Sequence, residues 1–244
     1  MPHFPERDET RNCWHATVLT LFPEIFPGPL GASLAGQALT ANIWSLETIQ
    51  IRDFGLGKHR QVDESPAGGG AGMVLRADVL GPALEHARTQ NPNAPLIYMS
   101  PRGAPLTQSI AHDLAGGPGV TVLAGRFEGI DERIIEEFNL REISIGDYVL
   151  SGGELAAMVL LDASVRLLPG VIGAPESLTQ ESFEQGLLEY PLYTKPREWA
   201  GRSIPDVLLS GDHKKIEAWR RSESARITAE RRPDLLGSKP IKPH

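Results

Sequence analysis

Short aliphatic runs that alternate with helical patterns constrain the fold of this chain more than any other feature. The runs read as buried strands of ordinary length, bounded by Gly, Pro or polar residues. The predicted strands are 16–22, 44–51, 95–100, 120–125 and 141–146. The predicted helices are 33–41, 77–90, 107–115, 131–138 and 154–168, with Thr107 and Asp131 as N-caps. Such alternation indicates an α/β fold with a mostly parallel sheet covered on both faces.

Three of the predicted strands run into loops of unusual composition. These loops read "YMSPRG" (98–103), "LAGRFEGIDE" (123–132) and "SIGDYVLSGGE" (144–154). Ligands of parallel α/β sheets bind beyond the carboxyl ends of the strands, so we expect a ligand pocket among these loops. Neither G-x-G-x-x-G nor G-x-x-x-x-G-K-[ST] occurs in them, which points away from phosphate recognition.

Individual residues of these loops suggest contacts with a ligand. Glu128 lies ahead of the Asp131 cap and can accept hydrogen bonds from a ribose hydroxyl or face a cationic ligand. The apolar residues after Gly146 offer backbone groups to the edge of a flat base such as adenine. Asp147 has two interpretations of similar weight: it faces a positive charge such as a sulfonium, or it bonds its own backbone in a turn.

The glycine-rich stretch "VDESPAGGGAGMVL" (62–75) also has two interpretations. Its bare backbone lets a ligand or another segment approach closely, or it is only a flexible connection between two elements. No Lys-Ser or Lys-Thr follows to complete a P-loop. Lys58, His59 and Arg60 precede it and either hold a phosphate or form a solvated turn.

Charge is distributed unevenly along the chain, whose formal net charge is −7. Residues 195–244 hold 12 Lys and Arg against 7 Asp and Glu, whereas the first 194 residues hold 12 against 24. The segment 211–236 predicts a basic amphipathic helix, or a pair of them, with Ile216, Trp219 and Ile227 as its apolar stripe. The net charge argues weakly against a nucleic-acid partner, but the basic end of the chain does not.

Composition also limits the cellular setting and the metal chemistry. The longest apolar run, 155–168, is too short to span a bilayer and carries Asp162 and Arg166. The polar N-terminus lacks the apolar stretch of a signal peptide, so a soluble cytoplasmic protein is expected. Cys13 is the only cysteine, which excludes an internal disulfide and a multi-cysteine metal site. No metal ligands are predicted.

Eight motifs in order along the chain resemble those of bacterial tRNA (guanine-N1)-methyltransferases of the SPOUT superfamily. They extend from about residue 16 to about residue 235, and read "TLFPEIF", "GGGAGMVL", "YMSPRG", "AGRFEGIDER", "SIGDYVLSGGELAAM", "LLPGVIG", "ESFEQGLLEYPLYTKP" and "VLLSGDHKKIEAWR". The resemblance implies methyl transfer from S-adenosylmethionine to N1 of the guanosine 3′ of the anticodon (position 37) in tRNA. It further implies a homodimer with active sites at the subunit interface, and a possible Mg²⁺ dependence.

The same resemblance implies an organisation in domains. An N-terminal extension (1–15) precedes a knotted S-adenosylmethionine-binding methyltransferase domain (16–172), whose α/β sheet is threaded into a deep trefoil knot. A linker (173–188) then leads to a small all-α C-terminal domain (189–244) that binds tRNA.

The resemblance also implies the site residues. Arg166 matches the arginine at guanine O6, and Glu181 matches the general base, although the commonest family pattern has Asp at that position. Phe127 replaces the tyrosine of the usual "GRYEG". The implied donor-binding residues are Tyr98, Met99, Ser100, Pro101, Gly125, Glu128, Ile145, Gly146, Asp147, Tyr148, Val149, Leu150, Gly152 and Gly153.

Two other functions compete with this one. The first is that of a SPOUT methyltransferase that acts on another RNA. The second is that of a non-catalytic RNA-binding protein of the same fold. A binding module would not need Arg166 and a linker carboxylate together.

Overall fold

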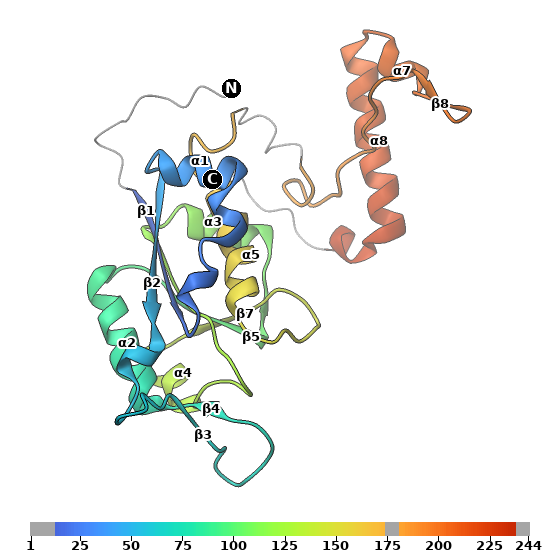
Figure 1. Ribbon diagram of the computed structural model, residues 1–244. Coiled ribbons are helices and arrows are strands. Elements are labelled where there is room, and N and C mark those ends of the chain that lie inside the picture. Colours follow the sequence, from blue (N-terminus) through green and yellow to red (C-terminus); the bar gives the residue numbers. More distant parts are fainter. Residues whose placement is uncertain (1–12, 174–180, 238–244) are drawn as a thin grey trace. The chain divides into compact units, whose positions relative to one another are not determined.

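The structure is a computed structural model that describes residues 13–173 and 181–237 (Figure 1). It divides into two compact units, Met1–Gly173 and Ala174–His244. Most of the predicted N-terminal extension and residues 174–180 of the predicted linker lie outside the described residues.

A parallel five-stranded sheet forms the centre of the first unit. Its order is β2-β1-β6-β5-β7, and every neighbouring pair is parallel. The strands are β1 (Trp14–Thr20), β2 (Trp44–Gln50), β5 (Leu96–Pro105), β6 (Gly119–Leu123) and β7 (Arg141–Ser144). The predicted parallel α/β fold is therefore confirmed.

The first strand begins two residues before the predicted strand 16–22. β1 already begins at Trp14, whose side chain is buried and whose indole N–H donates to the carbonyl of Leu114 (2.9 Å). This indole is anchored by a contact 100 residues away in the sequence, which a local pattern does not reveal.

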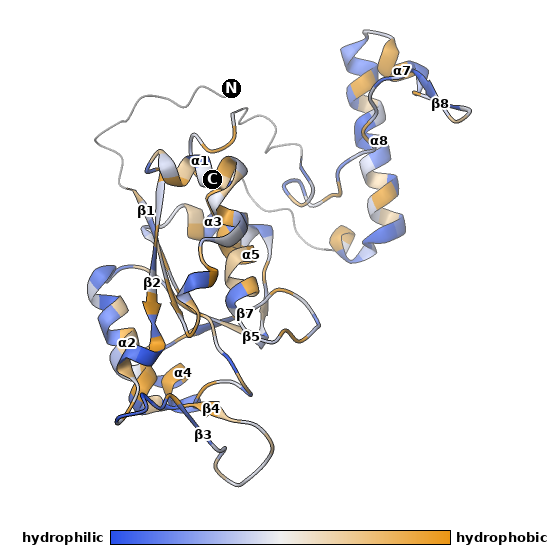
Figure 2. Ribbon diagram, viewed as in Figure 1, coloured by the Kyte–Doolittle hydropathy of each residue, from blue (hydrophilic) through white to orange (hydrophobic). Residues whose placement is uncertain are grey.

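Helices cover both faces of the sheet (Figure 1). On one face lie α1 (Ser33–Thr40), α3 (Gln108–Ala115) and α5 (Glu154–Val165); on the other lie α2 (Ala77–Gln90) and α4 (Glu132–Phe138). Figure 2 shows the hydrophobic residues of these helices, and those that are buried belong to the two apolar cores on either side of the sheet. The predicted caps are confirmed, because Thr107 accepts from the amide of Ile110 and Asp131 from that of Arg133.

Strand residues alternate between the two apolar cores, as the period of two requires. In β6, Val120 and Val122 belong to the core under α3 and α5, whereas Leu123 belongs to the core under α2 and α4. In β1, Val18 belongs to the core under α3 and α5, and Leu19 belongs to the core under α2 and α4.

Short elements complete the first unit. Three 3₁₀ turns connect the larger elements: η1 (Pro23–Ile25), η2 (Gly28–Gly31) and η3 (Ile51–Phe54). Strands β3 (Asp63–Glu64) and β4 (Val74–Leu75) pair antiparallel, and the glycine-rich stretch forms the loop between them.

β5 is longer than the predicted strand 95–100 because it continues through a bulge. Met99 and Ala104 both pair with Ile143, so the residues between them are pushed out of the ladder. Gly103 returns the chain to β7, and a Cβ there would overlap the backbone nitrogen of Ile143. The bulge turns Ser100 and Pro101 toward the carboxyl edge of the sheet, where they line a pocket.

The second unit is built around α8 (His213–Arg231), which confirms the predicted basic amphipathic helix. Ile227 is buried on it, and Ile216 and Trp219 are half-buried. The other elements of the unit are β8 (Glu198–Trp199), β9 (Arg202–Ser203), α7 (Asp206–Leu209) and η4 (Pro233–Gly237). The prediction of an all-α unit is therefore corrected, because β8 and β9 form a short antiparallel hairpin.

Part of the predicted linker, residues 181–188, packs on α8. The amide of Leu188 donates to the hydroxyl of Thr228 (2.9 Å), which is fully buried on that helix. The amide of Phe183 donates to the carbonyl of Leu187 (2.8 Å), which closes the segment into a turn. Its polar composition therefore reflects a turn rather than a free connection. Among the described residues, no helix is long and apolar enough to cross a membrane.

Candidate active site

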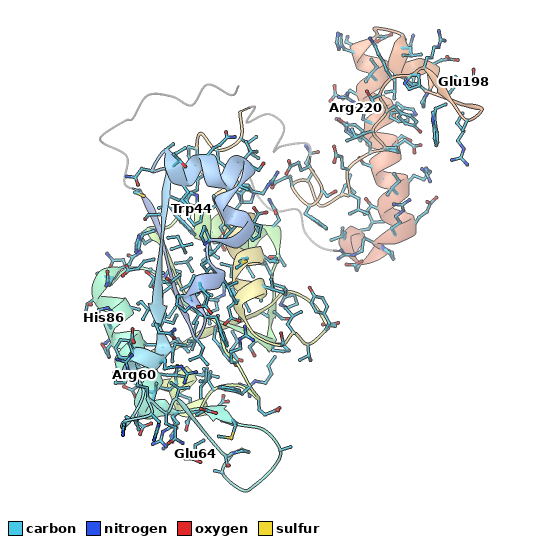
Figure 3. All side chains as sticks on the ribbon, in the orientation of Figure 1. Trp44, Arg60, Glu64, His86, Glu198 and Arg220 are labelled. Atoms are coloured by element: carbon cyan, nitrogen blue, oxygen red, sulfur yellow. The ribbon has the colours of Figure 1, made fainter. Side chains whose placement is uncertain are left out.

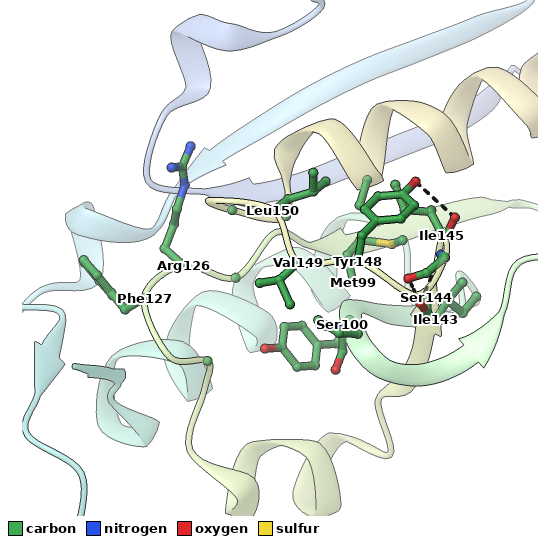
Figure 4. A pocket seen from close by; sticks show the side chains of 18 of the residues that line it. Met99, Ser100, Arg126, Phe127, Ile143, Ser144, Ile145, Tyr148, Val149 and Leu150 are labelled. Atoms are coloured by element: carbon green, nitrogen blue, oxygen red, sulfur yellow. Dashed lines mark hydrogen bonds between the residues drawn. The ribbon is translucent and has the colours of Figure 1, made fainter. Parts of the chain in front are cut away.

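A pocket of about 180 Å³ lies at the carboxyl edge of the sheet, where the segments after β5, β6 and β7 meet. Figure 4 shows its wall, with Met99 and Ser100 from β5 and Val149 and Leu150 from the loop after β7. The pocket is lined by every residue of the implied donor site except Asp147. Three loops that are separate in the sequence thus form one site.

Arg126 and Glu154 join the loops that follow β6 and β7. The guanidinium of Arg126 makes two contacts with the Glu154 carboxylate, Nε to Oε1 at 3.1 Å and Nη2 to Oε2 at 2.9 Å. It also donates to the carbonyl of Ser151 (3.2 Å). Glu154 is only 2% exposed, and Thr20 at the end of β1 donates to it as well (2.8 Å). One buried carboxylate therefore connects β1 with both loops.

Close backbone contact reinforces this junction. The amide of Gly153 donates to the carbonyl of Gly125 (2.8 Å). A Cβ on Gly153 would lie 2.8 Å from the Cα of Ala124, and one on Gly125 would lie 2.8 Å from the ring of Tyr98. The two glycines are thus required by the approach of one loop to the other and to β5.

The loop after β7 presents a bare backbone and apolar side chains. Val149 is 82% exposed, and the amides of Val149 and Leu150 meet no acceptor among the described residues. The loop is bent by Gly146, whose amide bonds the Ser144 hydroxyl, and by Tyr148, whose hydroxyl donates to the carbonyl of Ile145. The amides of Val149 and Leu150 are therefore available to donate hydrogen bonds to the edge of a base.

Tyr98 forms the floor of the pocket beneath the loop after β6. Burial raises the pKa of the Tyr98 phenol above its usual value, and the nearby Glu142 carboxylate raises it further. The phenol therefore stays protonated and neutral near pH 7.

Glu128 lies on the rim of the pocket beside the glycine-rich hairpin. Its amide donates to the carbonyl of Met73 (3.0 Å), and a Cβ on Gly72 would overlap its side chain. The hairpin is also bonded to this loop through the amide of Leu75 and the carbonyl of Gly129 (3.0 Å). Close approach of another segment therefore accounts for Gly72.

The sequence analysis missed six residues that line the pocket: Arg126, Phe127, Gly129, Ile143, Ser144 and Ala156. Arg126 could have been found from the sequence. It follows the candidate residue Gly125, and Glu154, at the end of another candidate loop, is a carboxylate that could pair with it. Phe127 was noted only as a substitution, and its backbone is left-handed (φ 60°). Asp147 is exposed and lies outside the pocket lining, so its role stays a prediction.

The two implied catalytic residues belong to different units. Arg166 caps the C-terminus of α5 and is half-buried. Glu181 begins the turn that packs on α8, and it lines a second pocket of about 190 Å³ together with Tyr190 and Arg220. The guanidinium of Arg220, labelled in Figure 3, lies 4.8 Å from the centre of the Tyr190 ring.

No cluster of three or more His, Cys, Asp or Glu side chains that could hold a metal occurs within residues 13–173 and 181–237. The expected Mg²⁺ dependence therefore gains no support from protein ligands in that part of the chain.

The parallel sheet and the pocket at its carboxyl edge define a ligand-binding α/β protein. The family described as "tRNA (Guanine-1)-methyltransferase TrmD" matches residues 14–238. The chain belongs to this family and is a methyltransferase.

Relatives named tRNA (guanine-N(1)-)-methyltransferase match nearly the whole chain. The one from Rhizorhabdus wittichii is 63% identical over 220 residues, which cover 90% of this chain and 89% of the relative. The one from Mesorhizobium japonicum is 63% identical and covers 93% and 97%, respectively. The one from Brucella suis is 60% identical and covers 96% and 94%.

Glu154→Gln should destabilise the protein by about 3 kcal/mol, because it removes one partner of a buried ion pair and leaves Arg126 uncompensated. Urea unfolding of the full chain measures this change. Asp53→Asn is the control, because Asp53 forms an ion pair with Arg60 in which both side chains are mostly exposed. That pair should contribute less than about 1 kcal/mol. Equal effects of the two substitutions would contradict a special role for Glu154.

Proposed function

We propose that this protein transfers the methyl group of S-adenosylmethionine to N1 of the guanosine 3′ of the anticodon, position 37, in tRNA. The observation that carries the proposal is the pocket itself, because it is formed by the three loops whose motifs resemble the family. Relatives that match more than nine-tenths of the chain are named tRNA (guanine-N(1)-)-methyltransferase, which supports the tRNA substrate and the N1 position.

The residues of the pocket fit a methyl donor of this kind. Val149 and Leu150 would hold the adenine between apolar side chains and free backbone amides. Glu128 on the rim would accept hydrogen bonds from ribose hydroxyls or face the positive sulfonium. When bound, S-adenosylmethionine supplies an electrophilic methyl group.

Arg166 and Glu181 would act on the guanine. N1–H of guanine is weakly acidic, so methylation of N1 needs that proton removed and the charge that develops on O6 stabilised. The Glu181 carboxylate would take the proton from N1, and the Arg166 guanidinium would donate hydrogen bonds to O6. Glu carries the same carboxylate as the usual Asp, one methylene further from the backbone.

The proposal has two further parts, a knotted chain in the first unit and a tRNA-binding role of the second. The region from β6 to α5 would be threaded as a trefoil knot, which is consistent with the bond from Gly153 to Gly125 and the junction of Arg126 with Glu154. Residues 189–244 would bind tRNA. The basic helix α8, whose arginines include Arg220, Arg221 and Arg226, supports this role.

The proposed assembly is a homodimer with active sites at the subunit interface. Leu155 and Val159 are 58% and 46% exposed, and they lie one turn apart on α5. A helix that begins at the pocket and exposes two large aliphatic side chains on one face is typical of a covered surface. Val149 and Leu150, which are also exposed, lie on the loop that leads into this helix.

Methylation of another RNA by the same chemistry is the alternative. The two proposals can be distinguished by the RNA that accepts the methyl group. With a tRNA that has guanosine 3′ of the anticodon, methyl label from S-adenosylmethionine should appear as 1-methylguanosine at that position. A tRNA with adenosine there should accept no label. Equal labelling of both tRNAs, or none of either, would overturn the proposed function.

Glu181→Gln should lower single-turnover methyl transfer by on the order of 10²- to 10⁴-fold, because the amide cannot take the N1 proton. Donor affinity, measured by calorimetry, should change little because Glu181 lies outside the pocket in the first unit. Glu184→Gln is the matched control three residues along the same turn, and it should retain near-normal turnover. Near-normal turnover of Glu181→Gln would remove Glu181 from the mechanism.

A further inference from the structure

The proposed function assigns RNA binding to residues 189–244 as a whole, but the only residues of that range that it names lie on α8. Residues 192–203, "LYTKPREWAGRS", are all exposed. Two aromatic side chains, Tyr193 and Trp199, are interleaved there with Lys195, Arg197 and Arg202, and Glu198 is the only acidic residue. We call these twelve residues the hairpin surface. The resemblance includes them in the tRNA-binding domain (189–244) but gives none of them an individual role.

The hairpin surface is built so that Trp199 and Arg202 lie on the same face. Trp199 of β8 pairs directly with Arg202 of β9, and side chains that are directly opposite in an antiparallel pair project to one side. The turn between them is Ala200 and Gly201, both left-handed (φ 50° and 72°), as a tight two-residue hairpin requires. Figure 3 marks the hairpin by Glu198, which precedes Trp199.

Contacts with the rest of the second unit hold the hairpin surface in place. The amide of Ile204 donates to the carbonyl of Arg197 (2.9 Å), and Arg197 pairs with Asp206 at 3.4 Å. At the other end, the rings of Tyr193 and Trp219 are 6.2 Å apart, which connects the segment to α8. Trp199 is therefore presented on a supported element.

The exposed side chains indicate the chemistry of the ligand. Trp199 is 71% exposed, and Arg202 forms no ion pair with any described residue. A flat apolar ring beside a guanidinium suits a ligand that has a flat face and a negative charge. An unpaired nucleotide has both, whereas the bases of a duplex are stacked on one another and cannot reach the indole.

We propose that the hairpin surface binds unpaired nucleotides of the RNA substrate, with Trp199 stacked on a base and Arg202 at the adjacent phosphate. The proposal rests on the proposed function in that tRNA supplies the unpaired nucleotides. Lys195 adds a further positive charge to the hairpin surface. Trp199 is thus an RNA-binding residue, not a catalytic one.

The test uses the full chain and an unmodified anticodon stem-loop RNA. Trp199→Ala should raise the Kd of this RNA roughly tenfold, since stacking of one base on an aromatic ring is worth that much. Trp199→Phe should recover most of the affinity. RNA should quench the tryptophan fluorescence of the wild type more than that of Trp199→Phe. A fully paired RNA duplex should quench neither.

Leu34→Ala is the control, because Leu34 is also an exposed apolar side chain but lies in the first unit, outside the hairpin surface. It should leave the Kd unchanged. An unchanged Kd for Trp199→Ala would overturn the proposal. So would a change of oligomeric state in sedimentation with Trp199→Ala, which would assign the surface to a second copy of the chain. Because RNA binding is measured without methyl transfer, its failure is distinguishable from failure of the proposed function.

Discussion

The contact between Arg126 and Glu154 is the interaction on which the site depends. It joins the loops that follow β6 and β7, two strands that β5 separates in the sheet. Glu154 is buried, and a buried carboxylate is tolerated only when its charge is compensated and its oxygens are bonded. The guanidinium of Arg126 compensates the charge, and Thr20 and Arg126 both donate to Oε1, so that they tie β1 to both loops.

The two units of the chain contribute different parts of the proposed site. The first unit supplies a fixed pocket whose wall is free backbone and apolar side chains, which suits a flat ligand. Under the proposed function, it also contributes Arg166, at the end of the helix that Glu154 begins. The second unit contributes the carboxylate of Glu181 and a basic helix. Under the proposed function, the donor and the RNA are thus bound by different units.

Local pattern predicted most of the sheet and its helices, because strand and helix periods and the caps at Thr107 and Asp131 are local properties. It also identified the loops of the pocket. It did not reveal the partner of Arg126, which lies 28 residues away, or the bulge opposite Ile143. It interpreted residues 173–188 as a linker, because composition does not distinguish a free connection from a turn that is bonded to Thr228.

The central claim is that the joined loops form the pocket of the methyl donor. Val149 tests it most directly, because it lines the pocket and yet is 82% exposed, so that its replacement should not disturb the core. The measurement is the Kd of S-adenosylmethionine by calorimetry for Val149→Arg, with Leu56→Arg as a control outside the pocket. The account predicts at least roughly tenfold weaker binding for Val149→Arg alone, a loss of about 1.4 kcal/mol or more. Equal affinity in the wild type and Val149→Arg would contradict it.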